Sequence, residues 1–156
     1  MTFISEHTID NVTSELERSD AQLEQALARM EEEQPHILAY LFSENFEVLT
    51  TAEKDYLLFL AIAIWKSIKK ETGTIALATE SSIGDVEERN WEIMSASKGK
   101  TFRDRLDPFF EQSPQEDLLA FAEDALTIDD ESEPTVTKEG REPMFVALKT
   151  IIDILT

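Results

Sequence analysis

Positions spaced alternately three and four residues apart form apolar stripes along most of this chain, and this period constrains the fold more than any other feature. A spacing of three and four places side chains on one face of an α-helix. We find no alternation of apolar and polar residues and no Asn-Gly hairpin signal, so the sequence predicts an all-α fold. The first stripe consists of Ile9, Val12, Leu16, Ser19, Leu23, Ala26 and Met30.

The first stripe has two interpretations. Its unbroken period favours one long helix over residues 8–33. Alternatively, Ser19 acts as an N-cap with Gln22 at the third helical position, and the segment divides into two helices. We favour the single helix.

The segment at about residues 51–72 is predicted to be the central helix. Thr50 and Glu53 have the spacing of a capping box, and Gly73 suits the end of the helix. Its apolar run, residues 56–65, is apolar on all sides of a helix, which is typical of a core helix that others surround. A membrane span needs about 20 apolar residues, so we expect no membrane segment here.

Helix signals account for most of the remaining chain. We expect a helix from Pro35 to about residue 49 and another over residues 82–97, with a loop or helical turn at 74–82. A short helix starts at Thr101 and is interrupted or restarted at Pro108. The pattern Ser-Pro-Gln-Glu at 113–116 opens the next helix, and Pro143 opens the last. Residues 1–156 are thus predicted to form one domain, a single irregular or orthogonal bundle of six or seven helices around the central helix.

The chain is strongly acidic, with a net charge of -19 over 156 residues. The charge is uneven: residues 1–35 hold nine acids and two bases, and residues 112–140 hold nine acids and one base. Residues 36–72 are nearly balanced, with five acids and four bases. This distribution argues against direct nucleic-acid binding, which requires clustered Lys and Arg, and favours a basic partner.

Most familiar catalytic patterns are absent from the sequence. There is no Cys, which excludes disulfides, thiolate nucleophiles and Cys-based metal sites. The nucleophile-elbow, dinucleotide-binding and zincin patterns do not occur, and Gly99-Lys100-Thr101 lacks the first glycine of a phosphate loop because position 94 is Met94. We therefore assign no catalytic, cofactor-binding or metal-binding residues and expect no cofactor. With no signal-peptide pattern, we expect a cytoplasmic protein.

Two weak metal patterns are better explained as solvated surface. Glu33 and His36 form a Glu-x-x-His pair, but Pro35 is expected to place them on different helices, and a di-metal site needs a second copy. Asp129, Glu131 and Glu133 resemble calcium ligands in their spacing. The positions where an EF-hand requires Gly and Glu hold Pro134 and Gly140.

One cluster of bases stands out in so acidic a chain. It is a candidate site for an anion or an acidic partner, with an aromatic side chain beside it. The alternative, which we favour, is pairing with acids of the same molecule such as Asp104 and Asp107, a common and weakly stabilising arrangement. The candidate residues are Lys98, Lys100, Arg103, Arg105 and Trp91.

Three functions remain open. The charge distribution favours a soluble protein-binding module, an adaptor or an inhibitor or immunity-type protein, that presents acidic faces to a basic protein partner. An enzyme or small-ligand binder with a pocket between helices is the alternative, because scattered carboxylates can act without a motif. A DNA-mimicking protein is the third interpretation. The oligomeric state does not follow from the sequence.

Overall fold

The computed structural model describes residues 2–127 and 136–156, and within them the chain is all-α, as predicted. No strand occurs in these ranges. The described residues form eight α-helices and one 3₁₀-helix, in this order: α1 (Glu6–Arg18), α2 (Asp20–Glu33), α3 (Pro35–Leu41), η1 (Glu44–Phe46), α4 (Thr51–Thr72), α5 (Glu80–Ala96), α6 (Phe102–Gln112), α7 (Glu116–Thr127) and α8 (Lys138–Leu155).

The first stripe forms two helices, so our preference for one long helix is wrong, and the described ranges hold more helices than the six or seven expected. Ser19 separates α1 from α2 with extended backbone angles, φ -143° and ψ 109°. Its hydroxyl accepts a hydrogen bond from the N–H of Gln22 at 3.2 Å. This cap satisfies a donor at the start of α2, while the apolar stripe continues on both sides of the break.

The predicted capping box of α4 is present. The Thr50 hydroxyl accepts from the N–H of Glu53 at 3.1 Å, and the Glu53 carboxylate accepts from the N–H of Thr50 at 2.8 Å. Gly73 ends the helix with φ 79°, in the left-handed region that favours glycine. Residues 60–65 are all buried, as expected of a central helix.

Helix α8 is extensively buried, like α4, and every residue from 144 to 152 is buried. The sequence predicted its start at Pro143, but it begins at Lys138 because the Thr137 hydroxyl caps it, accepting from the N–H of Gly140 at 3.1 Å. Pro143 therefore lies inside the helix, and Pro108 likewise lies inside α6 without interrupting it.

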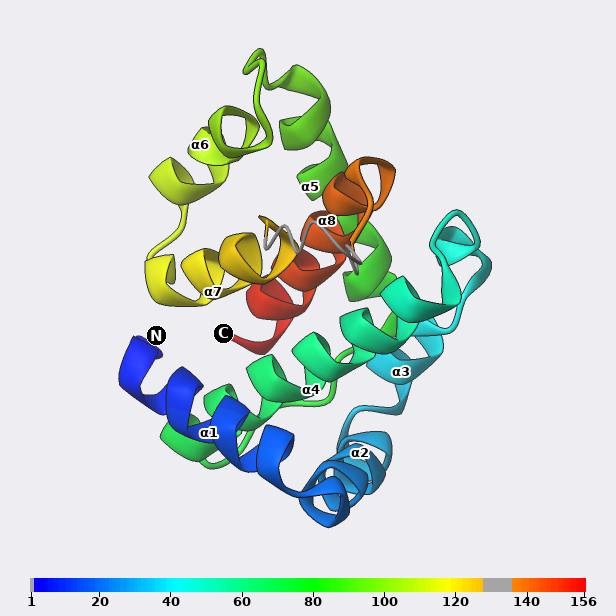
Figure 1. Cartoon of the computed structure of the whole chain (residues 1–156), viewed down its shortest axis with the longest axis vertical. Coiled ribbons are helices and arrows are strands. Elements are labelled where there is room, and N and C mark those ends of the chain that lie inside the picture. The colour runs from blue at the N-terminus through cyan, green and yellow to red at the C-terminus, as the bar shows by residue number, and fades with distance from the viewer. Residues whose placement is uncertain (1, 128–135) are drawn as a thin grey trace.

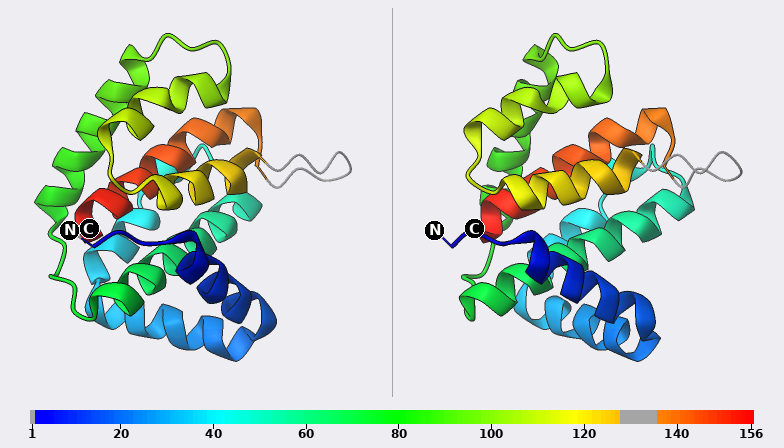
Figure 2. Two further views of the ribbon diagram at one scale, coloured as in Figure 1. Left: turned by 90° about the vertical axis from the view of Figure 1, so that its left-hand side faces the viewer. Right: turned by 60° about the vertical axis from the view of Figure 1, so that its left-hand side comes forward.

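Figures 1 and 2 show how the helices are arranged. Helix α8 packs against α4, α5 and α7, and α1 packs across the opposite side of α4. Helices α7 and α8 lie side by side, with α5 and α6 on one side of this pair and α4 on the other (Figure 2). The buried apolar cluster receives side chains from all eight helices. The centre is therefore shared by α4 and α8.

Residues 74–79, between α4 and α5, form a loop as predicted, but residues 80–82 already belong to α5. The buried side chain of Gln34 holds it: the Gln34 amide donates to the carbonyl of Ala76 at 2.9 Å, and its oxygen accepts from the N–H of Ala78 at 2.9 Å. One buried glutamine thus satisfies a backbone acceptor and a backbone donor of this loop.

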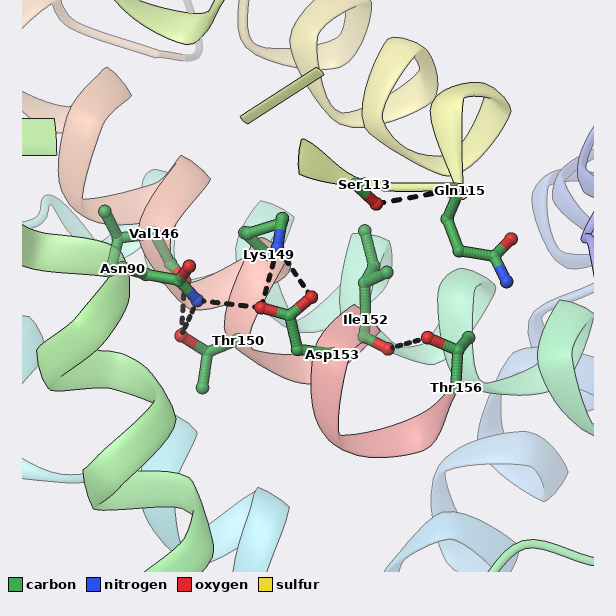
Figure 3. A network of polar contacts seen from close by, with 9 residues as sticks. All are labelled: Asn90, Ser113, Gln115, Val146, Lys149, Thr150, Ile152, Asp153 and Thr156. Carbon is green, nitrogen blue, oxygen red and sulfur yellow. Dashed lines mark hydrogen bonds and ion pairs between the residues drawn. The ribbon is translucent and has the colours of Figure 1, made fainter. Parts of the chain in front are cut away.

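A polar network joins α8 to α5 (Figure 3). The Lys149 ammonium contacts both carboxylate oxygens of Asp153 at 2.5 and 2.7 Å. The buried Asn90 amide donates to the Thr150 hydroxyl at 3.1 Å and to Asp153 at 3.2 Å. The buried side chains of Asn90, Lys149 and Thr150 each have a partner, so the network orients α5 on α8 instead of leaving an unpaired charge.

Candidate functional site

Helix α1, from the first acid-rich segment, packs beside α7, from the second. A groove of about 340 Å³ lies between these helices, with α4 as its floor. We call this the acidic groove. Its lining residues are Glu6, Ile9, Asp10, Thr13, Glu17, Tyr56, Phe59, Leu60, Asp117, Ala120, Phe121, Asp124 and Ala125.

Helical spacing places the carboxylates on the walls of the groove. Glu6, Asp10 and Glu17 lie along one face of α1, and Asp117 and Asp124 lie two turns apart on α7. None of the described residues that line the groove is basic. The acids on the two walls therefore reinforce one another's negative potential, which a cleft concentrates.

The floor of the acidic groove is aromatic and apolar. Phe59 and Phe121 are only half-buried, whereas Leu60 beneath them is fully buried. The Tyr56 hydroxyl donates to the carbonyl of Ala125 at 3.1 Å, which ties α4 to α7. Burial and the negative charge of Glu17 raise the pKa of Tyr56, so this hydroxyl keeps its proton.

Side chains at the start of α7 position the N-terminal segment over the groove's end. The Asp117 carboxylate accepts from the N–H of Glu6 at 2.9 Å, at the first turn of α1. The buried Gln115 side chain accepts from the N–H of Ile4 at 3.1 Å and donates to the carbonyl of Thr2 at 2.8 Å. These hydrogen bonds align α1 with α7, so contacts within the chain determine the shape of the groove.

This combination of walls and floor suits a particular ligand chemistry. Carboxylates at the rim attract Lys and Arg, and a half-buried aromatic floor accepts an apolar side chain. The volume lies at the lower end of the roughly 300–1,000 Å³ typical of ligand pockets, so it accepts an anchoring side chain and not a whole segment.

The bases predicted to form an anion site are only partly available. The Arg105 guanidinium binds Glu142 on α8 at 2.7 Å and the carbonyls of Met94 and Ser97 at 2.9 and 3.0 Å, so it caps the end of α5. Arg103 pairs with Glu123 on α7 at 2.6 Å. Both arginines thus pair within the molecule, but not with the neighbouring Asp104 and Asp107.

The other members of the predicted patch lie on the surface. Lys98 and Lys100 are exposed in the loop between α5 and α6, and Trp91 on α5 is 37% exposed. None of the five predicted side chains lines the acidic groove. An anion site at Lys98, Lys100, Arg103, Arg105 and Trp91 stays a prediction.

Of the two weak metal-binding patterns in the sequence, one lies within the described residues and the other lies outside them. Glu33 ends α2 and His36 lies on α3, so Pro35 does place them on separate helices. Across residues 2–127 and 136–156 no group of three or more His, Asp or Glu side chains is arranged to hold a metal ion. The calcium-like residues Asp129, Glu131 and Glu133 lie outside the described residues.

Comparison with protein-family models, curated proteins and solved structures gives no significant match. The assignment of function therefore rests on the geometry of the chain itself. Among the described helices, none combines the length and the apolar character needed to cross a lipid bilayer.

Proposed function

We propose that the chain is a cytoplasmic protein-binding module whose acidic groove receives a basic, amphipathic segment of a partner protein. One observation carries the proposal: the groove pairs five wall carboxylates with a half-buried aromatic floor and no described basic lining residue. Carboxylates alone would serve solubility, but exposed aromatic surface between them favours a partner that has both Lys or Arg and an apolar anchor.

The carboxylates and the aromatic side chains of the acidic groove are expected to contribute to binding in different ways. The carboxylates of Asp10, Glu17 and Asp124 are at the rim, where charges mainly speed encounter and select a partner of opposite sign. Phe59 and Phe121 form the desolvated part that holds the anchor, where most binding energy concentrates. Binding should therefore weaken as salt rises but persist in part.

A designed peptide tests this proposal directly. The probe is a dye-labelled amphipathic helix of Lys and Leu, followed by fluorescence anisotropy at low and high NaCl, with a Glu and Leu helix of equal length as the negative probe. We expect saturable binding of the basic peptide only. Asp10→Asn with Asp124→Asn should weaken it about tenfold, because two rim charges are lost.

Matched variants separate the groove from general acidity. Asp85→Asn with Asp107→Asn removes the same charge from exposed positions on α5 and α6 outside the groove, and should leave the affinity nearly unchanged. Phe121→Ala should weaken binding while leaving its salt dependence intact. Equal losses in the two double variants, or affinity that is insensitive to salt, would contradict the proposal.

A further inference from the structure

The folded chain concentrates bases at a place the sequence does not reveal. A second groove, of about 650 Å³, lies between α2 and α4 with Glu15 of α1 at its edge. We call it the basic groove. Its remaining lining residues are Gln22, Gln25, Ala26, Arg29, Trp65, Lys66, Lys69 and Lys70. Four of the chain's 14 bases therefore line one surface of a molecule with a net charge of -19.

Helical periodicity on both walls explains this concentration. Positions 22, 25, 26 and 29 fall on one face of α2, and positions 66, 69 and 70 fall on the facing side of α4. The three lysines occupy the last two turns of α4, where positive charge also complements the helix dipole. Residues separated by some 40 positions in sequence thus present their charges to the same space.

The bases are not fully neutralised by the acids around them. Glu33 is shared, since it contacts Arg29 at 3.1 Å and also pairs with Lys69. Lys66 approaches Glu15 at 3.6 Å, and Lys70 has no ion pair within the described part of the chain. Two carboxylates thus pair with three of the four cationic groups, which leaves an excess of positive charge.

One residue that lines the same groove carries a buried hydrogen-bond donor. Trp65 lines it and is only 3% exposed, and among the described residues its indole N–H has no hydrogen-bond partner. Buried polar groups are almost always paired, so an unpaired one calls for an acceptor. Lys66 and Lys69 share the groove lining with Trp65, and their flexible side chains can move to admit a ligand.

We propose that the basic groove binds a small phosphate-bearing anion, which the lysines and Arg29 attract and to which the Trp65 indole N–H donates a hydrogen bond. Phosphate is favoured over carboxylate because a phosphate group carries a charge of about -1.5 to -2 at pH 7, and several ammonium groups bind it as point charges. The single arginine already directs its Nε to Glu33, so a bidentate carboxylate fork is less available. The volume exceeds that of a bare phosphate and fits an organic phosphate or a polyphosphate.

This inference is independent of the proposed protein-binding function. The acidic groove uses α1, α4 and α7, and no residue lines both grooves. Variants of one groove therefore leave the lining of the other unchanged, and either proposal can fail alone.

The indole N–H signals test the proposal. The chain has two Trp, so a ¹H–¹⁵N spectrum of the full chain shows two indole peaks, and Trp91→Phe assigns them. Titration with pyrophosphate should move the Trp65 peak downfield with saturation and leave the Trp91 peak in place. Lys70→Gln should weaken this binding about tenfold, since it removes a cation that has no partner within the described residues.

Lys54→Gln is the matched control, because it makes the same chemical and charge change at an exposed lysine of α4 outside the groove and outside the predicted anion patch. It should bind pyrophosphate like the unmodified chain. Citrate, a polyanion without phosphate, should bind at least tenfold more weakly. A Trp65 peak that does not move, equal losses in the two lysine variants, or citrate binding as tight as pyrophosphate binding would overturn the proposal.

Discussion

Glu53 is a buried carboxylate with enough partners to remain charged. It is 1% exposed, and its oxygens accept from the N–H of Thr50 at 2.8 Å and from the N–H and hydroxyl of Thr137, each at 3.0 Å. Burial alone would raise its pKa, but these hydrogen bonds outweigh burial and lower the pKa below the ordinary 4.5. One side chain therefore joins the start of α4 to the start of α8.

Glu53→Gln should destabilise the fold by about 2–3 kcal/mol, because an amide NH₂ would face a donor where the carboxylate accepts. Urea unfolding at neutral pH measures this loss. Glu24→Gln, at an exposed position in the N-terminal half of α2, is the control and should change stability by less than about 0.5 kcal/mol. Equal effects of the two substitutions would show that Glu53 does not hold the helices together.

The same residue predicts a pH dependence with a definite sign. Since the folded pKa is lowered, the stabilisation is fully present above the unfolded value, near 4.5, and is lost as pH falls through the folded pKa. The difference in unfolding free energy between the unmodified chain and Glu53→Gln should therefore be largest at neutral pH and shrink below about pH 4.5. A difference that grows on acidification would contradict this assignment.

Two glycines that lie within helices, Gly140 and Gly84, differ in whether the surrounding structure leaves space for a side chain. A Cβ added at Gly140, in the first turn of α8, would lie 1.9 Å from the Glu53 carboxylate oxygen, which is held by its hydrogen bonds. A Cβ added at Gly84, in the interior of α5, meets no atom within 4 Å. Close approach to Glu53 requires glycine at position 140, and position 84 has no such requirement.

Gly84→Ala should stabilise the protein by about 0.5–1 kcal/mol, through reduced chain entropy in the unfolded state. Gly140→Ala should destabilise it by about 1–3 kcal/mol, because the methyl group displaces a buried, hydrogen-bonded carboxylate. Thermal unfolding of the two variants compares the same chemical change in two helices. Stabilisation by both substitutions would mean that Glu53 moves aside at little cost.

At the level of elements, local signals predict helices well where the cap and the apolar stripe agree. The box of Thr50 and Glu53 and the end at Gly73 mark α4 correctly. They fail where the signals compete: the stripe runs unbroken past Ser19, although the serine cap ends one helix and starts another. The start of α8 was predicted wrongly at Pro143. The helix begins earlier because Thr137 caps it, and Thr137 is itself held by Glu53, which is distant in sequence.

The candidate site depends on tertiary contacts, so the sequence predicts its ingredients but not its location. The two acid-rich segments were evident as composition, yet only the packing of α1 beside α7 places Asp10 and Asp124 around one groove. The concentration of bases predicted at residues 98–105 is local in sequence. The fold instead gathers bases from α2 and α4, whose lysines and arginine look unremarkable in the chain.

For the whole molecule, an excess of 33 acids over 14 bases predicts that self-repulsion limits stability. Added salt shortens the screening length from about 30 Å at 0.01 M to about 10 Å at 0.1 M. The midpoint of thermal unfolding should therefore rise as NaCl increases over this range. Ion pairs such as Arg103 with Glu123 oppose the trend, but exposed pairs contribute little.

Charge-reversing variants show whether the salt effect comes from this repulsion. Glu88 is exposed on α5, one turn from Glu92 and near Asp85, so Glu88→Lys replaces like-charge neighbours with opposite ones and should stabilise by a few tenths of a kcal/mol at low salt. Lys98→Glu should lower stability and steepen the salt dependence. The two variants should converge as NaCl rises, because screening removes what distinguishes them. Stability that falls with added salt, or a gap between the variants that persists at high salt, would mean that specific ion pairs dominate over net charge.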